Sequence, residues 1–267
     1  MPLAPHRQLI LSCCQVGESA DERLLELAVG PLDWRRLVAE TRRLELAPLV
    51  AWRLERLAAK TVPARPLARL REIYRRNLGR NLHLAEELGE VLDLFEAAEI
   101  PAIPLKGPVL AETVYGHPGL RRIYDLDVLV QRSDLERAVD LLRHSGYRSA
   151  TPKLLAGLEG ERDVSLARSA VVELHWALKD RFFHLPVDAL WAASVETAWH
   201  GRKIRTLPPE LLLLQLIHHL NYHAHPLKIL VDVARVIALH GETIDWARVA
   251  GLALEWHLQR NVRLALE

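Results

Sequence analysis

The sequence contains little cysteine. Its 267 residues include two cysteines, the adjacent Cys13 and Cys14. Two neighbouring thiols cannot build the disulfide framework of a small secreted domain, so their number suits a reducing compartment. We therefore interpret both as small core residues.

Long apolar runs and an excess of either charge are also absent from the sequence. No apolar run approaches the ~20 residues that span a bilayer, and the stretch Leu9–Leu11 is too short for the hydrophobic region of a signal peptide. With 35 basic and 34 acidic residues, the chain lacks the positive charge on which non-specific nucleic-acid binding depends. We expect a soluble, cytoplasmic protein with no membrane or nucleic-acid partner; its oligomeric state is not indicated.

Hydrophobic spacing divides the chain into three parts. Apolar residues recur every three or four positions from about 7 to 95, with a break at Pro63 and Pro66 before a long helix over 67–98. Strands are predicted at 100–105, as a sheet edge, and at 124–130, 147–150, 164–168, 171–176 and 203–207. Helices are predicted at 108–115, 133–145 with Glu136 in a capping box, 211–222, 229–239 and 246–257. The pattern predicts an α+β fold, with a small mixed-sheet core at 85–207 between helical segments 1–84 and 208–267.

An acidic pair lies inside one predicted strand. Asp125 and Asp127 alternate with apolar residues, which places them on one face, about 7 Å apart along the strand. Glu173 and His175 share a face of the 171–176 strand, and pairing of the two strands would make three carboxylates converge. Such groups repel one another without a cation. We therefore predict that Asp125, Asp127 and Glu173 hold Mg²⁺, which prefers carboxylate, water and phosphate oxygens.

Basic residues near this pair indicate a triphosphate. Lys106 is one of only six lysines and precedes Gly107, where a flexible backbone and a helix start would favour phosphate. Arg121 and Arg122, just before the acidic strand, are candidates for a bidentate phosphate clamp. The sequence contains a second basic set on one predicted helix. We interpret it as a solvated helix face or as a contact with phosphate or a partner: Arg71, Arg75, Arg76 and Arg80.

These motifs resemble a known family, the bacterial uncharacterised nucleotidyltransferases of the DNA polymerase β-like superfamily. The resemblance extends over roughly residues 85 to 250 and reaches the C-terminal helices through His219, His223 and the segment 231–234. The matching core motifs are Leu105-Lys106-Gly107, Tyr115, Arg121, the 125–130 strand, Gly146-Tyr147 and Glu173-Leu174-His175-Trp176.

The resemblance implies the nucleotidyltransferase fold and the Mg²⁺-dependent transfer of a nucleoside monophosphate from a nucleoside triphosphate, with ATP expected. The acceptor is unknown and could be a small molecule or a protein. The chain departs from the superfamily pattern after the first strand, where Pro108 follows Gly107 and the gap to Asp125 is long.

Two alternatives stay open at this point. His218, His219, His223 and His225 could serve a metal-dependent hydrolase, because His219 and His223 lie one helical turn apart and Asp232 could add a ligand. A catalytically silent nucleotide-binding module of the same fold is the other alternative.

Overall fold

The computed structural model describes residues 3–149, 163–179, 184–220 and 225–267. Its contacts divide the chain into two compact units. The first, which we call the helical unit, comprises residues 1–81, 111–122 and 223–241. The second, the sheet unit, comprises residues 82–110, 123–222 and 242–267.

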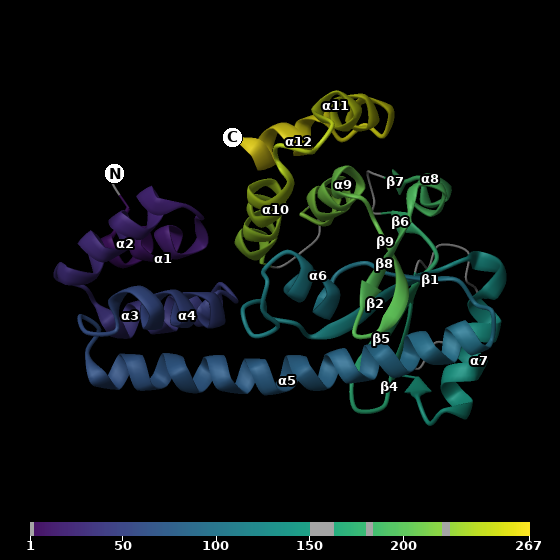
Figure 1. The fold of residues 1–267 in the computed structure, drawn as a ribbon, viewed down its shortest axis with the longest axis horizontal. Coiled ribbons are helices and arrows are strands. Elements are labelled where there is room, and N and C mark those ends of the chain that lie inside the picture. The colour runs from purple at the N-terminus through teal and green to yellow at the C-terminus, as the bar shows by residue number, and fades with distance from the viewer. Residues whose placement is uncertain (1–2, 150–162, 180–183, 221–224) are drawn as a thin grey trace. The chain divides into compact units, whose positions relative to one another are not determined.

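The helical unit is built from amphipathic helices, as the apolar spacing predicts. It contains α1 (Pro5–Cys14), α2 (Glu18–Val29), α3 (Trp34–Arg43), α4 (Ala47–Ala58), the first half of α5 (Ala64–Ala97) and α10 (Pro226–His240) (Figure 1). Cys13 and Cys14 are buried, free thiols in α1, which confirms their interpretation as core residues. Burial raises the pKa of Cys14 to about 12, so its thiol is unreactive at neutral pH.

A five-stranded mixed sheet forms the centre of the sheet unit. Its order is β1-β2-β5-β4-β3, in which β2 and β5 are parallel and the other neighbours are antiparallel. The strands are β1 (Ala102–Pro104), β2 (Asp125–Val130), β3 (Arg148–Ser149), β4 (Asp163–Ala167) and β5 (Val171–His175). The small mixed sheet of the predicted α+β fold is therefore confirmed, as is the edge position of β1.

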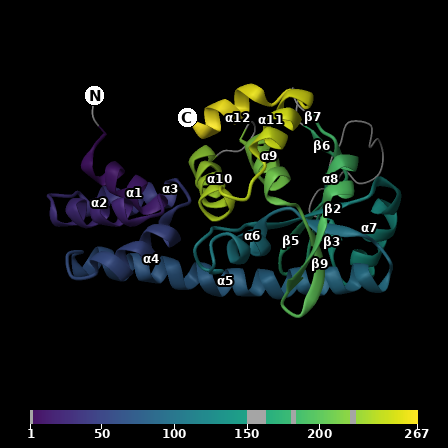
Figure 2. The same cartoon turned by 45° about the horizontal axis from the view of Figure 1, so that its top comes forward.

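Helices and two short ribbons complete the sheet unit. The ribbons are β6 (Leu178–Lys179) with β7 (His184–Leu185) and β8 (Val195–Trp199) with β9 (Arg202–Thr206). The helices are α7 (Leu135–His144), α8 (Val187–Ala193), α9 (Pro209–His219), α11 (Trp246–Glu255) and α12 (Gln259–Leu266), and α6 (Gly107–Thr113) begins here. The second half of α5 and α7 lie along the sheet in both views (Figures 1 and 2).

Alternation in β2 and β5 places their polar side chains on one face of the sheet and leaves the other face apolar. Leu126 and Val128 of β2 and Val172 and Leu174 of β5 are buried on one face. Asp127, opposite Glu173 in the register, lies on the other face with His175. The core therefore fixes the register, and the register fixes which polar groups meet.

Some local predictions fail. Ser133 lies in a 3₁₀ turn, η1 (Arg132–Asp134), so α7 starts later and the capping box at Glu136 is wrong; no side chain caps α7. The β8 strand and helices α8 and α12 are not predicted at all. Residues 150, 221 and 222, in the predicted segments 147–150 and 211–222, lie outside the described residues. No helix within the described ranges is long and apolar enough to cross a membrane.

Candidate active site

A lysine is held beside the acidic strand by the pairing of β1 with β2. Val128 is opposite Pro104, and the Leu105 backbone N–H donates to the Asp127 carbonyl at 3.0 Å. Lys106 therefore follows directly from the edge of the sheet. The long link between Gly107 and Asp125 leaves the sheet and returns to it. Lys106 and the acidic strand β2 therefore lie close together in space although they are far apart in the sequence.

Gly107 begins α6 in a left-handed conformation. Its φ of +65° is one that residues with a Cβ rarely adopt, whereas glycine adopts it without penalty. The glycine predicted for close backbone approach thus has a conformational role at this turn. It lets the chain change from strand to helix directly after Lys106.

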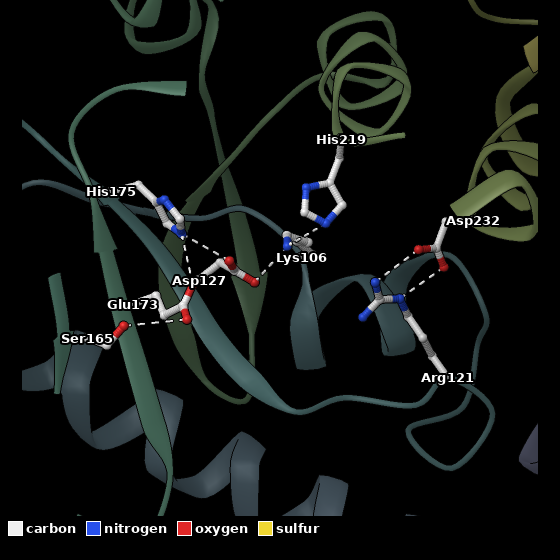
Figure 3. A network of polar contacts seen from close by, with 8 residues as sticks. All are labelled: Lys106, Arg121, Asp127, Ser165, Glu173, His175, His219 and Asp232. Carbon is white, nitrogen blue, oxygen red and sulfur yellow. Dashed lines mark hydrogen bonds and ion pairs between the residues drawn. The ribbon is translucent and has the colours of Figure 1, made fainter. Parts of the chain in front are cut away.

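Three side chains from β2 and β5 form a candidate metal site. Ligand atoms of Asp127, Glu173 and His175 lie within 4.8 Å of one another. His175 donates from Nε2 to Asp127 Oδ1 at 3.0 Å, and the same nitrogen is 3.8 Å from Glu173 Oε2 (Figure 3). We call these residues the Asp127 cluster. It follows from the parallel register, which places Asp127 beside Glu173, and from alternation, which adds His175.

Lys106 and His219 extend the polar network. Lys106 Nζ is 3.1 Å from Asp127 Oδ2 and 3.2 Å from His219 Nε2, at the end of α9 (Figure 3). The ammonium group can donate to both acceptors. Ser165, from the neighbouring strand β4, donates to Glu173 Oε1 at 3.5 Å. The cluster therefore contains hydrogen-bond donors that can orient both carboxylates.

The environment keeps Asp127 ionised. Its side chain is 4% exposed, against 15% for His175 and 27% for Glu173. Burial by itself would raise the pKa of Asp127, but the charge of Lys106 and the hydrogen bond from His175 outweigh burial and hold that pKa well below its ordinary value. A buried carboxylate is thus present in the charged form that a cation requires.

The donor set fits a divalent cation. Asp127 and Glu173 offer oxygen ligands, as Mg²⁺ prefers, and His175 can either ligate or orient Asp127 through its hydrogen bond. Asp125 lies two residues before Asp127 on β2, half-buried, and is outside the group of atoms within 4.8 Å found among the described residues. His175 was expected on the face of Glu173 but had no predicted role, and strand pairing is the signal that reveals one.

The two predicted clamp arginines have partners in the helical unit. Arg121 donates from Nε and Nη2 to the two carboxylate oxygens of Asp232, both at 2.9 Å (Figure 3). Tyr115 also donates to Asp232 Oδ1, at 2.6 Å. Arg121 is 6% exposed and Asp232 0%. Arg122 Nε lies 3.4 Å from Glu45 Oε2. The sequence gives no sign that Asp232, far along the chain, pairs with Arg121.

The histidines near α9 do not form a metal site in the described part of the chain. The one group of potential metal ligands found there is the Asp127 cluster. His218 is buried, and His219 contacts Lys106. His223, needed for the predicted pair with His219, lies outside the described residues.

Solved structures of two antibiotic-modifying enzymes are among those that match part of the chain. The crystal structure of ANT(2″)-Ia with adenylyl-2″-tobramycin has a TM-score of 0.47 and 12% identity, covering 65% of this chain and 96% of that chain. The lincomycin-bound lincosamide antibiotic adenylyltransferase LnuA has a TM-score of 0.41 and 16% identity, covering 58% and 96%.

The family resemblance is confirmed by a comparison of the whole sequence. No curated protein matches the chain. The sequence profile of the family described as uncharacterised nucleotidyltransferase matches residues 30–267. Because this match covers most of the chain, the protein belongs to that nucleotidyltransferase family.

Proposed function

We propose that the protein transfers a nucleoside monophosphate from a nucleoside triphosphate, with ATP as the expected donor, to a hydroxyl or similar group of a small-molecule or protein acceptor. The observation that carries this proposal is the Asp127 cluster with Lys106 3.1 Å from Asp127. Acidic ligands for Mg²⁺ beside a cation are what a triphosphate substrate requires. Membership of the nucleotidyltransferase family supports the same reaction class.

In this proposal the metal is held by Asp125, Asp127 and Glu173. Bound there with the triphosphate, Mg²⁺ would neutralise charge on the phosphate oxygens as the bond to the leaving group breaks. Asp127 is buried and ionised, which suits a fixed ligand. His175 positions Asp127 through its 3.0 Å hydrogen bond.

Lys106 is the proposed phosphate contact. In this structure its ammonium group is near Asp127, and a metal ion on that carboxylate would leave the lysine available to the β- and γ-phosphates. Gly107 provides the turn that follows it. Because Arg121 is buried against Asp232, it acts in the proposal as a structural residue, and Lys106 takes the phosphate-binding role.

The reaction proceeds by displacement at the α-phosphorus. The acceptor oxygen forms a bond to this phosphorus while the bond to the bridging oxygen breaks, and pyrophosphate leaves. The hydroxyl proton passes to a carboxylate. Glu173, which acts either as the third metal ligand or as this base, is proposed for the step because it is more exposed than Asp127, 27% against 4%, and belongs to the same cluster.

Labelled ATP tests the reaction. The protein is incubated with Mg²⁺, an extract of small molecules and proteins, and ATP labelled at either the α- or the γ-phosphate. The proposal expects α-label in a new product and γ-label in pyrophosphate only. Asp127→Asn should abolish transfer, whereas Asp140→Asn, at an exposed carboxylate on α7, should not. Binding of ATP without any turnover would instead support the silent module.

A further inference from the structure

An arginine-lined cavity of about 670 Å³ lies in the helical unit. It is formed by α3, the start of α4 and the first half of α5, which lie side by side in Figure 1. Six arginines line it: Arg42, Arg43, Arg69, Arg76, Arg80 and Arg122. Its acidic lining residues are Glu45 and Glu72, which leaves an excess of four positive charges in a chain whose net charge is +1.

The two glutamates are already shared among the arginines. Glu72 lies between two of them, with Oε2 2.6 Å from Arg69 Nη1 and Oε1 2.5 Å from Arg76 Nη2. Glu45 Oε2 is 3.4 Å from Arg122 Nε. Arg43 has a partner outside the lining, with its Nη2 3.4 Å from Glu40 Oε1. The excess of positive charge among the lining residues raises the electrostatic potential in a concave site and attracts anions.

The turn between α3 and α4 fixes one of these glutamates. Glu45 has a φ of +63°, a conformation that glycine usually provides at the end of a helix. The turn closes through hydrogen bonds from Leu46 N to Thr41 O at 2.9 Å and from Glu45 N to Arg42 O at 3.2 Å. A glycine here would relieve the backbone but remove the carboxylate beside Arg122. The side chain at this position therefore helps to order the guanidinium that lines the cavity.

Size and charge indicate the class of ligand. The volume lies in the range of small-molecule pockets, about 300 to 1,000 Å³. Guanidinium groups bind phosphate with paired hydrogen bonds. An excess of four charges matches two or three phosphate groups, each carrying roughly 1.5 to 2 negative charges. We propose that this cavity binds a small polyphosphate anion, either free or as part of a nucleotide.

The Asp127 cluster shares no residue with this cavity, so the proposal does not depend on the proposed reaction. A nucleic acid fits the observations less well, because the basic residues are gathered in a hollow and the chain as a whole has almost no excess positive charge. Of the two interpretations given for the basic helix face that includes Arg76 and Arg80, the proposal therefore favours the phosphate contact.

Titration calorimetry with sodium tripolyphosphate, without Mg²⁺, tests the proposal. The double variant Arg42→Ala/Arg80→Ala removes two exposed arginines of the cavity. Its matched control is Arg35→Ala/Arg75→Ala, two exposed arginines on the same helices, α3 and α5, that do not line the cavity. We expect the first variant to weaken binding at least about tenfold and the control to leave it unchanged.

Two further measurements are included. One distinguishes a free polyphosphate from a nucleotide, and the other distinguishes the cavity from the Asp127 cluster. Equal affinity for ATP and tripolyphosphate would indicate a free polyphosphate, and tighter ATP binding would indicate a nucleotide. Asp127→Asn should retain tripolyphosphate binding. The proposal is overturned by absence of binding to the natural protein, by equal losses in the two double variants, or by tighter binding of a single-stranded oligonucleotide that also depends on Arg42 and Arg80.

Discussion

Lys106 Nζ lies 3.1 Å from Asp127 Oδ2, so a lysine that directly follows the edge strand neutralises the most buried carboxylate of the candidate metal site. A cation on Asp127 would compete with this contact. We expect Lys106 to exchange its carboxylate partner for phosphate oxygens when a metal-bound triphosphate enters.

Replacement of Lys106 should therefore weaken nucleotide binding. Lys106→Met should reduce the affinity for Mg²⁺-ATP by about 10- to 100-fold, because a hydrogen bond to a charged group contributes about 1.5–3 kcal/mol. The measurement is titration calorimetry with a non-hydrolysable ATP analogue. Lys203→Met, at an exposed lysine on β9, is the control. An unchanged affinity in Lys106→Met would remove this residue from the site.

His175 should affect metal binding through Asp127. His175→Ala removes the 3.0 Å hydrogen bond that orients Asp127, and loss of such a contact weakens metal affinity by about 10- to 100-fold. Paramagnetic titration with Mn²⁺ measures the change directly, and His144→Ala on the exposed face of α7 serves as the control. A positioning role further predicts partial rescue by His175→Gln, whose amide can also donate. If both His175 variants bound Mn²⁺ like the natural protein, the positioning role would be wrong.

The ion pair of Arg121 and Asp232 should matter for stability. Both side chains are buried, and removal of one partner leaves a buried charge without compensation. Asp232→Asn should lower the free energy of unfolding by about 3–5 kcal/mol, as measured in urea. Tyr115→Phe, which removes one hydrogen bond to Asp232, should cost about 1–2 kcal/mol. Similar small losses in both variants would contradict a structural role for the pair.

Glu87 should make the stability of the sheet unit depend on pH. Its buried carboxylate accepts hydrogen bonds from Arg168 at 3.2 Å, from Tyr147 at 2.5 Å and from Ser169. Burial would raise the pKa of Glu87, but these donors outweigh burial and lower it. Because the pKa of Glu87 is lower in the folded state, its ionised carboxylate stabilises that state. This stabilisation is complete above the pKa of the unfolded state and is lost as pH falls through the pKa of the folded state.

Urea unfolding from neutral pH to pH 3 tests this dependence. Glu87→Gln should be less stable at neutral pH by about 1–3 kcal/mol and should lose less stability on acidification than the natural protein. Glu86→Gln, at the exposed neighbouring position on α5, should follow the natural protein. Parallel curves for Glu87→Gln and the natural protein would show that Glu87 does not control this transition.

Local patterns in the sequence predict much of the fold. Alternation in 125–130 and 171–176 places Asp125, Asp127 and Glu173 on one face once the two strands pair, because side chains alternate along a strand. It does not fix the register, which sets Asp127 and not Asp125 beside Glu173. The three-to-four spacing likewise predicts the long helix α5. The weak β8 strand escapes prediction because its side chains are mostly exposed and show no apolar alternation.

Contacts between distant segments cannot be derived from such patterns. Nothing in the spacing of Arg121 or Asp232 indicates that they pair, since Arg121 lies in the link before β2 and Asp232 lies far along the chain in α10. His219 is similar: a histidine at the end of an apolar helix gives no sign of its 3.2 Å contact with Lys106. Periodicity reports which face of an element is buried, but not which element covers it.

Mg²⁺-dependent ATP binding measures the role of the Asp127 cluster most directly. Calorimetry with a non-hydrolysable ATP analogue is performed with and without Mg²⁺ on the natural protein, Asp127→Asn, Glu173→Gln and the surface control Asp140→Asn. We predict Mg²⁺-dependent binding in the natural protein and the control, and its loss in both cluster variants while their unfolding curves remain cooperative. Undiminished Mg²⁺-dependent binding in a folded Asp127→Asn protein would contradict the assignment.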